Sequence, residues 1–141
     1  MPVAALLGAG ERLRAAMDQT QAQGLAAAHI GDILPIVALR VAGAVRLLYN
    51  PRVAGVAQEQ AAGPEGSVSM PGIEVLVSRP IWADIAYQTE TGAGEAERLE
   101  GWPARIALHE IDQVNGVFFL DRISRLKREA ALRRWRKLSR I

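Results

Sequence analysis

The stretch that governs both fold and chemistry is "ALHEIDQVNG", residues 107–116. It resembles the pattern His-Glu-x-x-His. In that pattern two histidines four residues apart share one face of a helix and hold a metal ion, while the Glu acts as general base. His109 and Glu110 fit the pattern, but Gln113 stands where the second histidine is expected. The stretch therefore predicts a helix that carries catalytic residue types in an altered metal site.

The composition bounds the class of protein. The chain has 141 residues, and half of them are hydrophobic. This is typical of a single domain, residues 1–141, with a sizeable core. No apolar run reaches the roughly 18 residues of a membrane span, and the N-terminus lacks the basic segment of a signal peptide. We therefore expect a cytoplasmic protein. The absence of cysteine excludes disulfides, thiolate nucleophiles and Cys-bound zinc.

Charge is unevenly distributed along the chain. The net charge is only +2, but the basic tail, residues 125–141, holds eight Lys or Arg and one Glu. The rest of the chain is acidic. A basic tail on an acidic body indicates an anionic partner, so the tail has three interpretations. It is a solvated helix face, a contact for RNA or a ribosomal surface, or a contact for an anionic membrane through a thin stripe of Leu126, Ala130 and Leu138 with Trp135 nearby.

Apolar runs and turn residues predict the strands. Residues 33–42 and 44–51 are rich in β-forming residues, and we expect Asn50 and Pro51 to end the second run. Residues 73–80 and 81–89 are two further expected strands. The Gly- and Pro-rich segment 55–72 is expected to be mostly loop, and 91–97 to be a hairpin turn. Residues 117–123 are expected to form a short strand or an extended run.

Helices are expected in three places. Residues 11–23 place Leu13 and Met17 on one face, with Gly24 as the terminator. Residues 103–115 begin with Pro103 as the first helical residue and are followed by Gly116. The chain from about 124 onward is the third. Helices and strands that do not alternate in βαβ order indicate an α+β fold.

Three fragments together resemble the signature motifs of the peptide deformylase family. "QGLAAAHIG" (23–31) is similar to G-x-G-L-A-A-x-Q-x-G, although its first Gly is replaced by Ala22. "EGSVSMPG" (65–72) is similar to E-G-C-L-S-x-P-G. "HEIDQVNG" (109–116) is similar to H-E-x-D-H-x-x-G. The motifs occur in the family's order with similar spacing. The resemblance covers roughly residues 11–141 and implies a deformylase-like fold around a central motif-bearing helix, plus a basic C-terminal helix.

The resemblance also implies roles for individual residues. In the family, one Cys and two His hold the metal; here Ser67 takes the place of the Cys, His109 is the retained ligand, and Gln113 replaces the second His. Glu110 corresponds to the general base. His29 stands at the position of the Gln that stabilises the oxyanion.

Peptide binding is implied for four positions in the first two motifs: Gly24, Leu25, Ser67 and Val68. The resemblance further implies that the peptide is the N-terminus of a nascent, formylated chain. The family's C-terminal helix is associated with ribosome docking.

The two ligand substitutions weaken a metal site substantially. A structural zinc site is worth about 10–16 kcal/mol over its ligands, so losing two ligands costs about 6 kcal/mol, or about 10⁴-fold in affinity. We therefore expect no cofactor, or a weakly bound divalent ion of Fe, Ni or Zn. Deformylase activity is then expected to be weak or absent, with peptide binding retained.

Several alternatives remain open. The chain is an active amidohydrolase if His29, His109 and Glu110 rebuild a metal site. It is a ribosome or RNA adaptor if the basic tail carries the function. Ser67 acts as a nucleophile if a histidine activates it. Asp112 is interpreted as structural, paired with an Arg.

Overall fold

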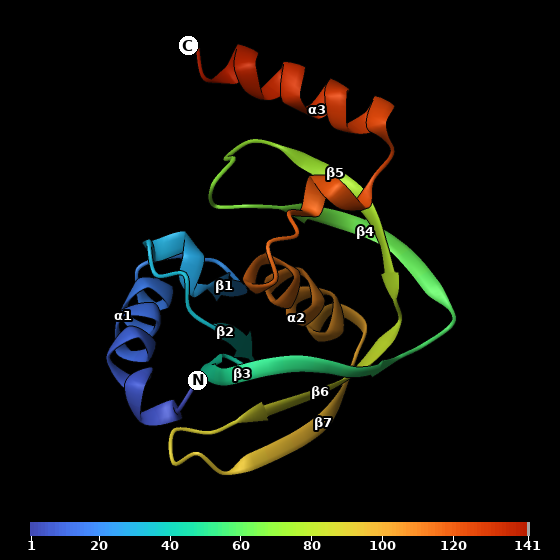
Figure 1. Ribbon diagram of the computed structural model, residues 1–141. Coiled ribbons are helices and arrows are strands. Elements are labelled where there is room, and N and C mark those ends of the chain that lie inside the picture. The colour runs from blue at the N-terminus through green and yellow to red at the C-terminus, as the bar shows by residue number, and fades with distance from the viewer. Residues whose placement is uncertain (141) are drawn as a thin grey trace.

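The computed structural model describes residues 1–140 and confirms the mixed α+β class (Figure 1). The helices are α1 (Leu7–Asp18), α2 (Gly101–Val114) and α3 (Arg125–Leu138). Three short 3₁₀ segments are η1 (Val3–Ala5), η2 (Ala27–Ile30) and η3 (Phe119–Arg122). The strands are β1 (Gly24–Ala26), β2 (Ile36–Val41), β3 (Ala44–Val56), β4 (Gln60–Gly66), β5 (Glu74–Pro80), β6 (Trp82–Gln88) and β7 (Gly94–Glu100).

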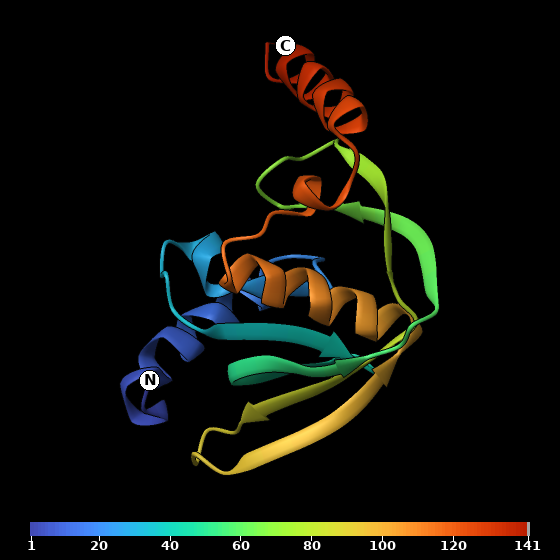
Figure 2. The same ribbon diagram turned by 45° about the vertical axis from the view of Figure 1, so that its right-hand side comes forward.

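A five-stranded antiparallel sheet with the order β1-β2-β3-β6-β7 separates α1 from α2 (Figure 2). Ile36 and Ala38 pack with α1 on one face of β2, and Val37 and Leu39 pack with α2 on the other. Alternate residues of a strand point to opposite faces, so a strand covered on both sides must be apolar throughout. This explains the unbroken apolar run in β2.

The β4–β5 hairpin forms a second, two-stranded sheet beside α2. Met70, Ile73 and Val77 from this hairpin and the loop that joins its strands form a separate core cluster with η3 and α3. From α3, Ala131 is buried and Trp135 packs against the cluster. The basic tail is therefore a helix, as predicted, and it packs against the hairpin cluster. Its last residue, 141, lies outside the described residues.

The face of α3 that packs inward differs from the predicted stripe. Leu126 is 74% exposed, and Ala130 is exposed as well. Ala131, Leu132 and Trp135 contact the hairpin instead. Within residues 1–140, no helix is long and apolar enough to cross a membrane.

The prediction that Asn50 and Pro51 end a strand is wrong, because β3 continues to Val56. The chain forms a bulge there: Tyr49 pairs with Gln88 and Arg52 with Ala86, so β3 has one extra residue. Asn50 has a positive φ of 47°. Asn tolerates this region, and a bulge accommodates a proline that cannot donate a hydrogen bond.

The prediction of loop structure for 55–72 is also wrong in its centre. Residues 60–66 form β4, and all seven pair with β5. Gly63 and Pro64 are poor strand formers, but β4 is an edge strand, where proline is tolerated. Likewise, β7 begins at Gly94, so the expected turn at 91–97 is confined to residues 89–93.

Other boundaries shift by a few residues. α1 spans residues 7–18 rather than 11–23, although Leu13 and Met17 are fully buried on its inner face as predicted. Within residues 117–123, Phe119–Arg122 form η3 rather than a strand, and the flanking Phe118 and Ile123 are extended. α2 begins at Gly101, which makes Pro103 its third residue. Gly116 follows the helix with φ of 80°, as expected of a residue beyond the C-cap.

Candidate active site

α2 places His109 and Glu110 on the side facing the β4–β5 hairpin and β1. Both side chains are buried, with exposed fractions of 9% and 4%. The His109 ring stacks on Phe119 of η3, with 5.5 Å between ring centroids. The amphipathic character of α2 explains this burial, because Ala104, Ala107, Leu108 and Ile111 anchor the helix on the sheet.

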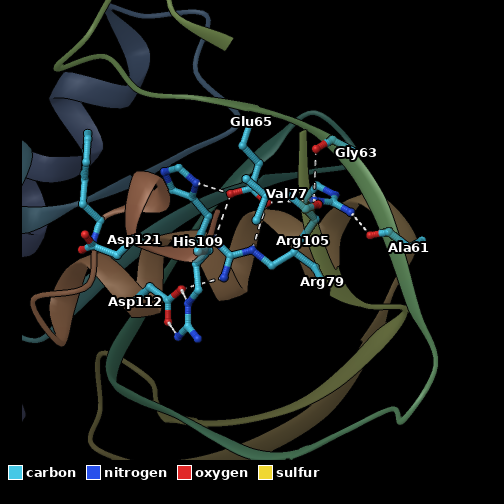
Figure 3. A network of polar contacts seen from close by, with 11 residues as sticks. Ala61, Gly63, Glu65, Val77, Arg79, Arg105, His109, Asp112 and Asp121 are labelled. Atoms are coloured by element: carbon cyan, nitrogen blue, oxygen red, sulfur yellow. Dashed lines mark hydrogen bonds and ion pairs between the residues drawn. The ribbon is translucent and has the colours of Figure 1, made fainter. Parts of the chain in front are cut away.

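A buried polar network lies behind His109 (Figure 3). His109 Nδ1 is 2.8 Å from Oε1 of Glu65 on β4. Glu65 accepts two hydrogen bonds of 2.9 Å from the Arg79 guanidinium and one of 2.8 Å from Arg105 Nη1. Arg79 also donates to Asp112, which accepts two bonds from Arg122. This confirms that Asp112 is structural and paired with arginine.

The network fixes the protonation state of Glu65 and the orientation of His109. Burial favours the neutral acid, but hydrogen bonds from Arg79 and His109 outweigh it and lower the pKa of Glu65 to about 2. An ionised carboxylate only accepts hydrogen bonds, so His109 donates through Nδ1–H. Nε2 is thus left free, the arrangement found in histidines that ligate metals.

Glu110 lies in a different environment from Glu65. Burial raises its pKa to about 7, a change that the neighbouring His109 opposes and Glu65 reinforces. Its Oε1 is buried and has no hydrogen-bond partner among the described residues. A carboxyl group with a pKa near neutrality suits acid–base chemistry.

His29 lies on η2 and is half-buried. Its Nδ1 is 3.1 Å from the Ala26 amide nitrogen and 3.2 Å from the Ala26 carbonyl oxygen. Burial lowers its pKa, the bond to Ala26 opposes this, and His109 lowers it further. His29 is therefore neutral at pH 7. Its buried Nε2 has no partner within residues 1–140.

The two substituted ligand positions carry neutral side chains. The Ser67 Oγ accepts a hydrogen bond of 3.1 Å from the Ser69 amide. No hydrogen bond joins Ser67 to either histidine in the described part of the chain, so the serine–histidine nucleophile finds no support. Gln113 follows His109 by one helical turn, and its Oε1 is buried without a partner.

A cavity of about 340 Å³ joins the three motifs. It brings together the predicted residues Gly24, Leu25, His29, Ser67, Val68, His109 and Glu110. Gln113, one turn along α2, is not among the lining residues. The remaining wall includes Trp102, Arg105 and Ile106.

Gly24 is where β1 approaches α2 most closely. A Cβ on Gly24 would lie 2.6 Å from Ile106 Cγ2 and 3.0 Å from Glu110 Cγ. Any side chain there would displace the cavity wall or the Glu110 carboxylate. The glycine of the first motif thus allows β1 to approach α2 without displacing these side chains.

The donors do not fit the metal site that the sequence resemblance implies. Residues 1–140 contain no group of three or more His, Cys, Asp or Glu side chains positioned to hold a metal ion. His109 offers a suitably oriented nitrogen, but a serine hydroxyl and a carboxamide replace a thiolate and an imidazole. The alternative in which His29, His109 and Glu110 rebuild a metal site therefore finds no support in this geometry.

Arg105 and Glu65 are functional residues that the sequence reasoning missed. Arg105 donates to Glu65 and to three backbone carbonyls, those of Ala61, Gly63 and Val77. Its position one turn before His109 was a usable signal, because residues four apart on a helix share a face. The position of Glu65 inside the second motif was another.

Comparison with known proteins agrees with this geometry. The family model described as polypeptide deformylase matches residues 5–129. A peptide deformylase-like protein of Agrobacterium fabrum is 40% identical over 115 residues, covering 81% of this chain and 70% of that protein. A peptide deformylase of Treponema pallidum is 36% identical over 115 residues, covering 82% and 71%.

Solved structures give the same result. The peptide deformylase of Thermus thermophilus is 30% identical, with a TM-score of 0.88 over 97% of this chain and 83% of that one. The Plasmodium falciparum peptide deformylase, in complex with an inhibitor, is 26% identical, with a TM-score of 0.84 over 96% and 85%. The three motifs, the fold and these matches together show that the chain belongs to the polypeptide deformylase family.

Proposed function

We propose that this chain binds the N-terminal segment of an extended peptide and has weak or absent deformylase activity. One observation carries the proposal. The four positions that the resemblance assigns to peptide binding, Gly24, Leu25, Ser67 and Val68, line one cavity, while neutral side chains occupy two of the three ligand positions.

Backbone pairing supports peptide binding. β1 is the last strand of the five-stranded sheet, so its outer edge is free of a strand partner among the described residues. An extended peptide can add to such an edge through main-chain hydrogen bonds, with its side chains in adjacent pockets. Apolar side chains on the cavity wall, Leu25, Val68 and Ile106, suit an apolar N-terminal residue.

The ligand chemistry supports low activity. A serine hydroxyl must lose a proton to ligate a metal well, and a carboxamide is a weaker donor than imidazole. A metal in this family supplies an activated water. Glu110 would still serve as the acid–base group and His29 as the oxyanion donor. Without a metal-activated water, however, no nucleophile is available to attack the formyl group.

Chemical-shift mapping with a formyl-Met peptide tests the proposal. We expect shifts at residues 67–72 and in β1, and no release of formate above background. Val68→Asp should abolish the shifts. Val56→Asp is the matched control, since Val56 is similarly exposed, at 45% against 47%, but lies outside the cavity. Absence of shifts at high peptide excess refutes peptide binding, and rapid formate release refutes the loss of activity.

We propose a second function for the basic tail, because seven of its cations are exposed: Arg125, Lys127, Arg133, Arg134, Arg136, Lys137 and Arg140. RNA or a ribosomal surface would match this charge. Reversing the charge of Arg133, Arg134, Arg136 and Lys137 should abolish binding, and binding by the natural chain should weaken steeply with salt. Charge reversal is preferable to deleting 125–141, because deletion also removes Ala131 and Trp135 from the hairpin core. Salt-insensitive binding refutes this function.

A further inference from the structure

A second cavity, of about 320 Å³, lies between the β4–β5 hairpin and the start of α2. Its wall includes Ala62 of β4 and Gly101 of α2. Three residues, Pro64, Trp102 and Arg105, line both this cavity and the one that joins the motifs. These three residues therefore form a partition between the two cavities.

Arg105 is the fixed part of this partition. Its guanidinium donates to the Glu65 carboxylate and to carbonyl oxygens on both strands of the hairpin, those of Ala61 and Gly63 on β4 and Val77 on β5 (Figure 3). The hairpin is closed around this group, because a Cβ on Gly63 would lie 2.9 Å from the central guanidinium carbon. Arg105 cannot swing aside without breaking several hydrogen bonds, so it forms a rigid wall.

The partition lies at a defined distance from His109 along α2. Trp102, Arg105 and Ile106 precede His109 and Glu110 on the cavity face of the helix at helical spacing. An α-helix rises about 1.5 Å per residue, which places Arg105 about 6 Å before His109 along the axis. An extended unbranched side chain advances about 1.3 Å per bond, so the four bonds of a Met side chain cover about 5 Å. A first side chain that follows α2 from His109 thus reaches the partition at about the length of Met.

We propose that the partition of Trp102 and Arg105 determines specificity, because it limits bound peptides to those whose first side chain is no longer than about four bonds. A longer side chain needs the space of the second cavity, which the partition separates from the first. Up to that limit, contact with the apolar wall of Leu25, Val68 and Ile106 favours an apolar side chain. This inference rests on the proposed peptide binding and defines which first residues the site accepts.

A homologous series of formylated peptides tests the limit. The peptides are N-formyl-X-Ala-Ser, in which X is norleucine, 2-aminooctanoic acid or 2-aminodecanoic acid, with unbranched side chains of increasing length. Each additional methylene that becomes buried should raise the affinity about fourfold. For the natural chain, we expect calorimetry to show that the two longer peptides bind no more tightly than the norleucine peptide. A steady fourfold gain per methylene through the series overturns the inference.

Two variants open the partition. Trp102→Ala removes a half-exposed ring, and Arg105→Ala removes the rigid wall. Each should bind the two longer peptides about tenfold or more tightly than the natural chain does, since the added methylenes then become buried. The longer peptides should also shift the amide resonances of Ala62 and Ile81, which line the second cavity. Trp82→Ala is the matched control, since Trp82 lies on β6 outside both cavities, and it should keep the length limit of the natural chain.

The ratio of affinities distinguishes a specificity role from a structural one. Damage to the fold weakens binding of all three peptides alike, whereas opening the partition changes the ratio between long and short. Trp102→Ala keeps the inference testable if Arg105→Ala does not fold, because Trp102 is 50% exposed. An unchanged length limit in the folded variants overturns the inference.

The outcomes also separate this inference from the proposed function. If none of the three peptides shifts residues 67–72, peptide binding itself fails and the inference fails with it. If all three bind the natural chain with rising affinity, peptide binding stands and only the length limit is refuted.

Discussion

Two groups of buried polar side chains meet at His109, and they differ in how well they are satisfied. On the hairpin side, Glu65, Arg79, Arg105 and Asp112 are fully paired. In the second group, Glu110, Gln113 and His29 each have a buried atom without a partner among the described residues, and Glu110 and His29 line the cavity. α2 carries members of both groups, whereas Glu65 and Arg79 come from β4 and β5 and His29 comes from η2.

The difference separates a support from a binding surface. The paired group holds the imidazole of His109 in one orientation. This group needs no ligand to be stable, because its hydrogen bonds are satisfied within the protein. The unpaired group carries a cost that a bound group would remove. Variants that repair, remove or neutralise one group at a time distinguish the two.

The largest effect is expected from repairing the metal ligands. The double substitution Ser67→Cys and Gln113→His restores a thiolate and an imidazole beside a correctly oriented His109. Zinc or nickel affinity should rise by about 10⁴-fold, because each ligand contributes roughly 3–4 kcal/mol. Competition with a chelator of known affinity measures the change. An unaltered affinity would mean that the backbone no longer places these positions around one point.

Removing the centre of the support should cost almost as much. Glu65→Ala leaves Arg79 and Arg105, which are 4% and 8% exposed, without their shared carboxylate. Breaking a buried ion pair in this way costs about 3–5 kcal/mol of unfolding free energy. Urea denaturation measures the loss. Glu95→Ala, exposed on β7, should stay within about 0.5 kcal/mol of the natural chain.

Glu110 should make stability depend on pH in the opposite sense to an ion-paired carboxylate. Its folded pKa of about 7 exceeds its usual value of 4.5, so the folded state prefers the protonated form. Glu110 therefore does not lower the free energy of unfolding below about pH 4.5. As the pH rises from about 4.5 to about 7, the free energy of unfolding falls by about 3 kcal/mol. Glu110→Gln should lose this dependence, so that the two proteins match near pH 4 and diverge by pH 8. Parallel stability curves from pH 4 to 8 would contradict the buried, unpaired state of Glu110.

Crowding the cavity at Gly24 should have a smaller effect. Gly24→Ala places a methyl group within 2.6 Å of Ile106, and overpacking of this kind costs about 1–3 kcal/mol. It should also weaken peptide binding, because the Glu110 side chain must move. Gly94→Ala is the control, since a Cβ there meets nothing within 4 Å. Equal behaviour of the two variants in thermal unfolding and peptide titration would show that β1 does not contact α2 closely.

The sequence predicted the site better than it predicted the strands around it. "HEIDQ" specified a helix and the relative positions of His109, Glu110 and Gln113 through helical periodicity alone. The Gly- and Pro-rich residues 60–66 gave no β signal, and they form β4 only because β5 pairs with every residue of it. Strand formation there depends on a partner distant in sequence, which local patterns do not reveal.

The chemistry of the site shows the same limit. The sequence identified Glu110 as an acid–base residue, but its unpaired oxygen follows from burial among residues of three separate motifs. In the sequence, the spacing of Arg105 four residues before His109 indicates a shared helix face but not the groups that Arg105 contacts. Its role appears only when Gly63 comes to lie against it, where a Cβ would be 2.9 Å from the guanidinium.

The most direct test of the account is the metal content of the untagged chain, purified without oxygen and measured by mass spectrometry for Fe, Ni and Zn. The account predicts well below one metal ion per chain, with the Ser67→Cys and Gln113→His double variant approaching one under the same conditions. A content close to one ion per natural chain, which is lost in His109→Ala, would contradict the account. It would indicate that this protein is a metal-dependent hydrolase.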